Sequence, residues 1–243
     1  MVTIITGGGR GIGAATAAYL ARTGHDLVVN YRRDRAAAEA VAAAATGVRA
    51  VAVRADVADP SDVDRLFAAA AELGPVTGLV NSAGLTAHIG DLADTPVATI
   101  RTVLDVNLLG TVLCARKAAQ VMSTRRGGPG GAIVNVSSAA ATLGSAHEYV
   151  HYAAAKAAVD ALTVGLGKEL AGDGIRVNAV SPGIVRTTIH ADAGFADRPD
   201  ALAGRVPLGR AGEPDEIAPA IGWLLGPESG YVTGAVLRVA GGL

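Results

Sequence analysis

The stretch SAHEYVHYAAAK carries the residue types of two different chemistries. His147, Glu148 and His151 have the spacing of a zinc-protease helix, in which two histidines bind the metal and the glutamate is the general base. Tyr152 and Lys156 stand four residues apart, so a helix would place a phenol and an ammonium on one face. The segment alone leaves open a metal-dependent hydrolase and an enzyme that moves a hydride.

A zinc site needs a third protein ligand, and Glu169 lies at a tolerable distance downstream. His147 follows Leu-Gly-Ser, so we expect it in a loop or at a helix start rather than on a formed helix face. His25, His88 and His190 are scattered along the chain. Because zinc would explain so few residues, we predict no metal site.

The elements that position these residues must come from a chain of 243 residues, which is long enough for one large domain with a substantial core. Hydrophobic residues make up 50% of the chain but aromatic residues only 3%, so alanine, valine and leucine must fill the interior. The 21 basic residues nearly balance the 22 acidic ones. This balance provides no basic surface for nucleic acid.

The single cysteine, Cys114, excludes an intramolecular disulfide and fits a reducing compartment. It lies in an apolar run, so we expect a buried, inert thiol. The N-terminal MVTIIT lacks the cationic lead of a targeting signal. No unbroken run of about 18 apolar residues indicates a membrane span. We therefore expect a cytoplasmic protein without a membrane partner.

Short β-branched runs alternate with longer alanine-rich runs along the chain. The expected strands are 2–6, 27–31, 49–54, 78–83, 132–137, 176–181 and 235–240. The expected helices include 12–23, 34–45, 61–73, 97–124, 149–171 and 214–225. Nearly continuous apolar strands are typical of a parallel sheet covered on both faces. The pattern predicts an α/β fold, a doubly wound seven-stranded parallel sheet (Rossmann fold) with helices on both faces and right-handed crossovers.

We find no linker, so residues 1–243 are expected to form a single dinucleotide-binding domain. The longest irregular segment runs from about 187 to 212 and contains Pro199, Pro207 and several glycines. A loop of this length in a compact domain is usually functional. We expect a substrate lid, with a mobile surface insertion as the alternative.

The sequence TGGGRGIG follows the first expected strand and runs directly into a helix. Gly7, Gly11 and Gly13 allow a tight turn and let the backbone approach a pyrophosphate. The N-terminus of the following helix offers free N–H groups and a positive dipole to that anion. The strand–turn–helix context therefore indicates a dinucleotide site.

The end of the second expected strand reads NYRR, with no acidic residue before Asp34. An NAD site usually has a carboxylate here to hold the ribose 2′-hydroxyl, whereas arginine attracts the 2′-phosphate of NADP. Arg32 and Arg33 could do this, and Arg10 in the glycine turn could reach the same phosphate. NADP(H) is favoured and NAD(H) remains possible; alternatively, these arginines are solvated surface charges.

Over essentially its whole length the chain resembles the short-chain dehydrogenase/reductase family, including its 3-oxoacyl-ACP reductase-like and glucose 1-dehydrogenase-like members. The glycine turn, ADV around Asp56, DVNLLG, NVSS, the Tyr-x-x-x-Lys pair and PGIVRT all match family motifs in order. NSAG departs from the usual NNAG by a serine in the second place. Near the C-terminus, Ala240 stands where an aspartate is common.

The resemblance implies a catalytic set consisting of Asn107, Ser138, Tyr152 and Lys156. With the glycine turn and the arginines, it also implies a larger set of cofactor contacts. These are Gly7, Arg10, Gly11, Ile12, Gly13, Tyr31, Arg32, Arg33, Asp56, Val57, Asn81, Ala83, Gly84, Tyr152, Lys156, Pro182, Gly183, Val185 and Thr187.

The residue types suit reduction of a carbonyl, which leaves an alkoxide that a tyrosine hydroxyl can protonate. We expect Lys156 and the positive charge of the oxidised nicotinamide to lower the pKa of Tyr152 toward working pH. The resemblance implies that Ser138 holds the substrate oxygen and that Asn107 anchors a water linked to Lys156. Taken singly, these residues could be a surface pair, a strand-end cap and a backbone-bonded helix residue. The neighbouring Ser137 leaves the choice of serine ambiguous.

We therefore expect an NADP-preferring oxidoreductase that interconverts an alcohol and a ketone or aldehyde. The resemblance implies 3-oxoacyl thioesters or sugars as substrates, and a homotetramer. His147, Glu148 and Tyr149 would border the substrate cleft and favour a polar substrate, unless they face solvent. The alternative function is a catalytically silent sensor or scaffold that keeps the fold.

Overall fold

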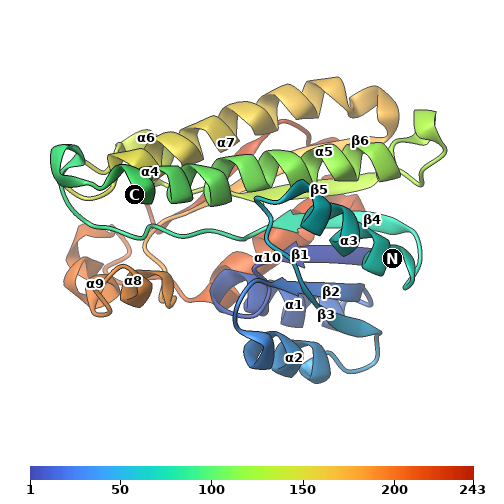
Figure 1. The fold of residues 1–243 in the computed structure, drawn as a ribbon, viewed down its shortest axis with the longest axis horizontal. Helices are drawn as coiled ribbons and strands as arrows, with labels where there is room; N and C mark the ends of the chain where they lie inside the picture. The colour runs from blue at the N-terminus through green and yellow to red at the C-terminus, as the bar shows by residue number, and fades with distance from the viewer.

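The computed structural model describes residues 1–243 and contains one seven-stranded parallel sheet (Figure 1). Its strand order is β3-β2-β1-β4-β5-β6-β7. The strands are β1 (Val2–Thr6), β2 (Asp26–Tyr31), β3 (Ala50–Arg54), β4 (Val76–Asn81), β5 (Gly131–Val136), β6 (Ile175–Pro182) and β7 (Val236–Val239). All seven expected strands are present, and the predicted doubly wound sheet is confirmed.

Ten α-helices flank the sheet or follow its strands. They are α1 (Gly11–Arg22), α2 (Arg35–Ala44), α3 (Pro60–Ala71), α4 (Val97–Leu104), α5 (Gly110–Met122), α6 (Ala140–Leu143), α7 (Val150–Glu169), α8 (Ile189–Asp192), α9 (Arg198–Ala201) and α10 (Pro214–Leu225). A π-helical turn, Asp105–Leu109, joins α4 to α5. The segment expected to be irregular, 187–212, contains the short helices α8 and α9.

Local sequence signals account for where several helices begin. Asp59 caps α3, because its carboxylate accepts from the backbone N–H groups of Ser61 and Asp62, and Pro60 occupies the first helical position. Asp34 caps α2 in the same way. The helix α1 is different: it begins after Arg10 without any side-chain cap.

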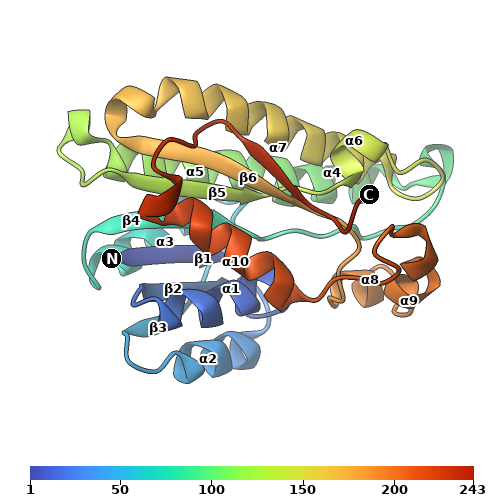
Figure 2. The ribbon, with the colours of Figure 1, turned by 180° about the vertical axis from the view of Figure 1, so that it is seen from behind.

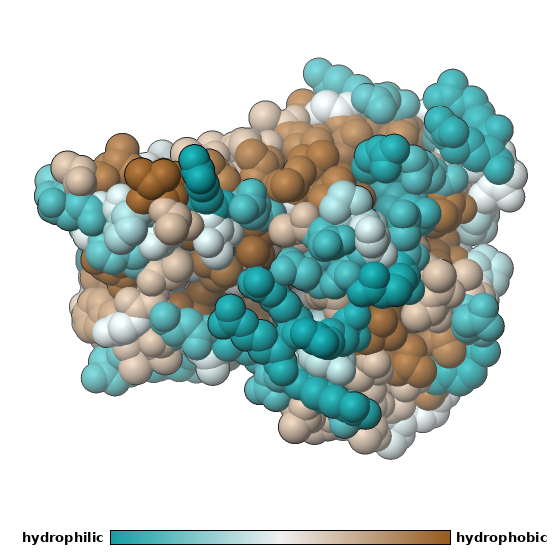
Figure 3. Space-filling view, in the orientation of Figure 1, coloured by the Kyte–Doolittle hydropathy of each residue, from teal (hydrophilic) through white to brown (hydrophobic).

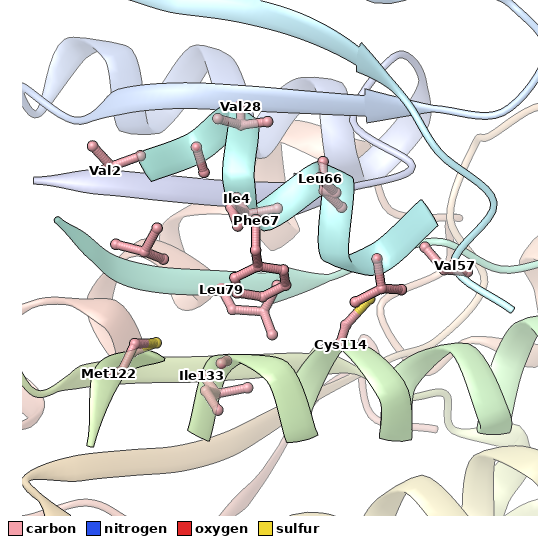
Figure 4. Packing of buried hydrophobic residues seen from close by; sticks show 14 of the residues in the cluster. Val2, Ile4, Val28, Val57, Leu66, Phe67, Leu79, Cys114, Met122 and Ile133 are labelled. Carbon is pink, nitrogen blue, oxygen red and sulfur yellow. The ribbon is translucent and has the colours of Figure 1, made fainter. Parts of the chain in front are cut away.

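The core forms two layers because neighbouring residues of each strand point to opposite faces of the sheet. Ile4 packs toward α3 and α5, whereas Ile5 packs toward α1 and α10. Figure 4 shows the first layer, in which Phe67 of α3 and Cys114 of α5 meet the strands. Cys114 is fully buried, as predicted, and burial raises the pKa of its thiol to about 12.

The last crossover of the sheet differs in hand from the first. The connections β1–β2 and β6–β7 step in opposite directions along the sheet, yet α1 and α10 pack against each other on the same face. Figure 2 shows α10 in front of the strands on this face. Because both connections join parallel strands, their hands must be opposite, so right-handed crossovers throughout were a wrong prediction. The long segment between β6 and α10 carries the chain to the face of the sheet on which α1 and α10 pack. This connection therefore lacks the usual geometry of a short crossover.

The continuous helix of α4, the π-helical turn and α5 also exposes several apolar side chains, namely Val97, Leu104, Leu109 and Val121. Val97–Met122 spans 26 residues, and one 18-residue window has a mean hydropathy of 1.5 with 28% of it buried. By length and composition alone this helix could cross a membrane, which the sequence had not led us to expect. Its inner side packs on the sheet through Cys114 and Met122. Figure 3 shows hydrophobic residues gathered in a band over α5 and α7.

Candidate active site

A cleft of about 660 Å³ opens at the carboxyl ends of the strands. This is where open α/β sheets bind ligands, because the strand order reverses there between β1 and β4. Its walls come from the glycine turn, the end of β2, the loops after β4 and β5, α7, and the segment that follows β6. Figure 3 shows a hollow on this face of the molecule.

The glycine turn brings a bare helix N-terminus into the cleft. Gly7 has a φ of +62°, and a Cβ there would lie 2.8 Å from the Cα of Ala83. A Cβ on Gly13 would lie 2.4 Å from the carbonyl oxygen of Gly7, so only glycine allows the turn to close on α1. The helix α1 has neither a side-chain cap nor an acidic residue in its first turn. Its free N–H groups and dipole therefore suit a phosphate, and the site fits a dinucleotide.

Two of the three expected phosphate-binding arginines are held by carboxylates. Arg32 Nε lies 2.8 Å from Oδ2 of Asp56, and Arg10 Nη2 lies 2.6 Å from Oδ2 of Asp192 in α8. Arg33 has no ion-pair partner. All three arginines line the cleft. The carboxylate of Asp56, itself a predicted cofactor contact, therefore orients Arg32.

Tyr152 and Lys156 lie in the first two turns of α7 at the floor of the cleft. Tyr152 is only 8% exposed and Lys156 only 4%. The ammonium of Lys156 donates a hydrogen bond of 2.8 Å to the carbonyl of Val136. The hydroxyl of Ser138, two residues beyond, accepts from the backbone N–H of Ala140 at 3.2 Å and favours the ionised form of Tyr152. Ser137 instead donates to the backbone carbonyl of Lys156 at 3.3 Å. The geometry therefore separates the two adjacent serines and associates Ser138 with the tyrosine.

Burial, rather than mutual attraction, dominates the ionisation of this pair. Desolvation raises the pKa of Tyr152, although the neighbouring hydroxyl of Ser138 acts in the opposite direction. Desolvation also lowers the pKa of Lys156 to about 8. In the ligand-free site, loss of water penalises both charged forms. The expected lowering of the pKa of Tyr152 by Lys156 and the oxidised nicotinamide stays a prediction for the loaded enzyme.

Asn107 lies in the π-helical turn behind the cleft and is fully buried. Its Nδ2 donates to the carbonyls of Leu85 at 2.7 Å and Val103 at 2.9 Å. Its Oδ1 accepts from the N–H of Leu85 at 3.3 Å. A Cβ on Gly84 would lie 2.9 Å from this oxygen and 3.8 Å from Nζ of Lys156. The amide of Asn107 thus fixes the loop after β4 next to the lysine.

Most residues predicted to bind the cofactor line the cleft, and so do three of the four predicted catalytic residues. Gly13, Asn81 and Asn107 do not. Asn81 is buried between strands, where its Nδ2 donates to Oδ1 of Asn135 at 2.9 Å. These three residues shape the cleft indirectly: Gly13 through the glycine turn, Asn81 through the sheet and Asn107 through the loop after β4.

The zinc-type motif is dispersed among separate partners. His147 lies in the turn before α7 with a φ of +63°, and its Nδ1 is 2.8 Å from a carboxylate oxygen of Asp91. Glu148 forms an ion pair with Arg198, and His151 is buried on α7. His147 is therefore outside the helix, as the preceding Leu-Gly-Ser predicted.

Sequence reasoning missed some residues that line the cleft. Arg198 in α9 and Asp192 in α8 belong to the segment after β6, and Thr86 and Thr102 border the cleft from the other side. These residues sit in loops or short helices without a recognisable motif. Only the irregular composition of 187–212 indicated that part of the chain.

The fold and the site together define a class of protein. An open parallel sheet with a bare helix N-terminus at its switch point, and a buried tyrosine, lysine and serine in the same cleft, characterise a nicotinamide-dependent oxidoreductase. Residues 7–243 match the sequence profile of the family described as Enoyl-(Acyl carrier protein) reductase. The chain belongs to the short-chain dehydrogenase/reductase family, and the resemblance inferred from its motifs is confirmed.

Individual relatives cover nearly the whole chain. The protein is 43% identical over 244 residues to the Uncharacterized oxidoreductase YgfF of Escherichia coli (strain K12), and the match covers 99% of both chains. It is 38% identical to L-rhamnose 1-dehydrogenase (NAD(P)(+)) of Sphingomonas sp. (strain SKA58), covering 99% of this chain and 94% of the relative. A dehydrogenase/reductase structure from Sinorhizobium meliloti 1021 superposes with a TM-score of 0.90 at 36% identity, covering 99% and 94%. The protein is thus an NAD(P)-dependent oxidoreductase acting on alcohols or carbonyl compounds.

Proposed function

We propose that the protein is an NADP-preferring oxidoreductase that interconverts an alcohol with a ketone or aldehyde, with Tyr152 as the proton donor and acceptor. One observation carries this proposal: Ser138, Tyr152 and Lys156 meet on the floor of the cleft that also contains the bare N-terminus of α1. When bound, a nicotinamide dinucleotide supplies or accepts the hydride.

The residues of the chain handle the substrate oxygen and its proton. In the direction of reduction, the hydroxyl of Ser138 donates a hydrogen bond to the carbonyl oxygen, and Oη of Tyr152 transfers its proton to the oxygen as the alcohol forms. The resulting phenolate is stabilised by Ser138 and by the ammonium of Lys156. Lys156 also keeps the nearby Val136 carbonyl satisfied, so its position is fixed before the substrate enters. Oxidation reverses these steps.

The preference for NADP is supported by the charges at the end of β2. No acidic side chain precedes Asp34 there, and Asp34 caps α2 through the backbone N–H of Ala37. Arg33 carries an unpaired positive charge on the rim of the cleft, next to Arg32. At this rim the guanidinium groups would donate paired hydrogen bonds to a 2′-phosphate, whereas a 2′-hydroxyl would gain much less from them.

A side-by-side fluorescence titration with NADPH and NADH tests the preference. We expect NADPH to bind at least tenfold more tightly, and Arg33→Ala to weaken NADPH alone by about tenfold. Arg126→Ala, which changes an exposed arginine outside the cleft, is the matched control. Tighter binding of NADH would show that the arginine side chains face solvent and do not bind a phosphate.

The proposal includes a substrate lid, a tetramer and a cytoplasmic location. The segment 187–212 supplies lid residues such as His190 and Arg198 to the cleft. Exposed apolar side chains on the outer sides of α5, α7 and β7, among them Val121, Val164 and Val236, suit contacts between subunits. Light scattering of the purified protein should give four times the chain mass of 24.1 kDa. A monomeric mass would refute the tetramer.

A further inference from the structure

The substrate end of the cleft contains an almost fully buried arginine. Arg198, in α9, is only 4% exposed. Its guanidinium lies over the ring of Tyr149, with Cζ 5.1 Å from the ring centre, and its Nη2 forms an ion pair with Oε2 of Glu148. Arginine is seldom buried unless it is paired. The stacking and the ion pair together hold its planar group in one orientation.

The arginine retains hydrogen-bonding capacity toward the cleft. A guanidinium has five N–H donors, and the hydrogen bonds of Arg198 involve one acceptor, Glu148. Arg198 lines the cleft together with Tyr149 and His190, on the side of Tyr152 and Ser138. The free donors of Arg198 therefore face the space that the part of the substrate beyond its reacting carbon would occupy.

His190 adds an acceptor to this wall. Its Nε2 lies 3.2 Å from the carbonyl oxygen of Val185, so this nitrogen carries the proton and donates to the carbonyl. In the neutral ring, Nδ1 is then an acceptor. Burial and the nearby Arg198 lower the pKa of His190 and thus favour this neutral form. This wall of the cleft therefore offers hydrogen-bond donors from Arg198 and an acceptor from His190.

The balance of charge distinguishes the substrates that could use this wall. Glu148 already neutralises Arg198, so a carboxylate substrate would bring an uncompensated negative charge into a desolvated space. Hydroxyl groups accept from Arg198 and donate to His190 without adding charge. A hydrocarbon would leave the guanidinium donors without partners.

We propose that Arg198, oriented by Glu148 and Tyr149, is the specificity-determining residue of this enzyme and selects uncharged polyhydroxylated substrates, such as sugars or sugar alcohols, over carboxylates and hydrocarbon alcohols. The inference deepens the proposed function and rests on it. Arg198 and His190 bind hydroxyl groups of the substrate, and Glu148 acts through Arg198 as a positioning residue.

The test compares four probe compounds: sorbitol, D-glucose, cyclohexanol and 4-hydroxycyclohexanecarboxylate. Calorimetry measures their binding to protein saturated with NADPH, and kcat/KM for oxidation is measured separately with NADP⁺. We expect sorbitol or glucose to bind at least tenfold more tightly than cyclohexanol. Arg198→Lys keeps the charge but loses the planar donors, so it should weaken the polyols about tenfold and leave cyclohexanol unchanged.

Glu148→Gln gives the sharper outcome, because it leaves Arg198 with an uncompensated positive charge. We expect this variant to bind the carboxylate at least tenfold more tightly than the unmodified protein does. Glu72→Gln, at an exposed position at the end of α3, removes the same charge outside the cleft and should change none of the four affinities. Thermal unfolding confirms that each variant is folded.

Two results would overturn the inference. One is tighter binding of the carboxylate than of the polyols by the unmodified protein. The other is an equal change for all four compounds in Arg198→Lys and Glu148→Gln, which would indicate a structural role only. Polyol binding with the expected pattern but without turnover would contradict the proposed function and leave the inference on Arg198 standing.

Discussion

Nζ of Lys156 lies 5.7 Å from the centre of the Tyr152 ring, one helical turn along α7, and both side chains are almost completely removed from solvent. The hydroxyl of Tyr152 is therefore protonated in the free enzyme at neutral pH, since burial raises its pKa. A protonated phenol is the form that reduction of a carbonyl requires. Oxidation of an alcohol needs the phenolate, so its rate should increase with pH while the rate of reduction stays nearly level between pH 6 and 8.

The buried lysine should leave a signature in the pH dependence of stability. Its pKa falls from 10.5 to about 8 on folding, so between these values the unfolded chain binds a proton that the folded protein has lost. The free energy of unfolding must then rise with pH in this window. Above about pH 10 the raised pKa of Tyr152 acts in the opposite direction.

Lys156→Met keeps most of the apolar stem and removes this titration. We expect the stability of the unmodified protein relative to this variant to rise by about 2 kcal/mol from pH 7 to pH 10. Urea unfolding at several pH values measures the difference. A difference that stays flat over this range would show that Lys156 is hydrated and charged in the folded protein.

The two adjacent serines should behave differently. Ser138→Ala removes the cleft hydroxyl that favours the phenolate of Tyr152 and should lower kcat by roughly a hundredfold. Ser137→Ala removes a bond to the backbone carbonyl of Lys156, so we expect a loss of only a few fold. Steady-state kinetics with saturating cofactor compares them. The reverse order would transfer the catalytic role to Ser137.

The glycine turn should not tolerate a side chain at Gly13. An alanine Cβ there would lie 2.4 Å from the carbonyl oxygen of Gly7, and the forced shift should destabilise the protein by about 1–3 kcal/mol and weaken cofactor binding. Gly172→Ala, in the exposed 3-10 turn Ala171–Asp173, meets nothing within 4 Å. It should stabilise the protein by up to about 1 kcal/mol. Thermal melts with and without NADPH measure the stability and the cofactor binding of both variants. Equal melting temperatures for the two variants would contradict the prediction.

The ion pair between Arg10 and Asp192 should compete with a 2′-phosphate for the arginine. Asp192→Asn releases Arg10, so we expect NADPH to bind severalfold more tightly and NADH to be unaffected. The gain should shrink at high salt, because both side chains are about half exposed. Asp94→Asn, at the exposed end of the 3-10 helix Leu92–Asp94, is the control. An equal gain for both cofactors would place Arg10 away from the phosphate.

The sheet was predictable because its strands are covered on both faces. The runs around Ile4 and Val28 are almost continuously apolar, and a parallel sheet between two helix layers buries them completely. The glycine turn was equally readable, since the close approach of Gly13 to Gly7 admits no other residue. The hand of the last crossover could not be predicted, because it depends on the path of a long segment without a periodic pattern.

The partners of the charged residues were also beyond the reach of the sequence. Arg10 meets Asp192, and Glu148 meets Arg198, across long stretches of chain that only the folded sheet brings together. The effect of burial on the pKa of Tyr152 could not be predicted from the sequence for a related reason. The spacing to Lys156 shows a neighbouring charge but not how far both groups are removed from water.

The most direct test of the proposed chemistry is Tyr152→Phe, assayed for both turnover and NADPH binding. The substitution removes the transferable proton and one hydroxyl and leaves the glycine turn and the arginines intact. We predict a loss of at least about a thousandfold in kcat, with an NADPH dissociation constant within a few fold of the original value. Undiminished turnover in this variant would contradict the role of Tyr152 and with it the proposed mechanism.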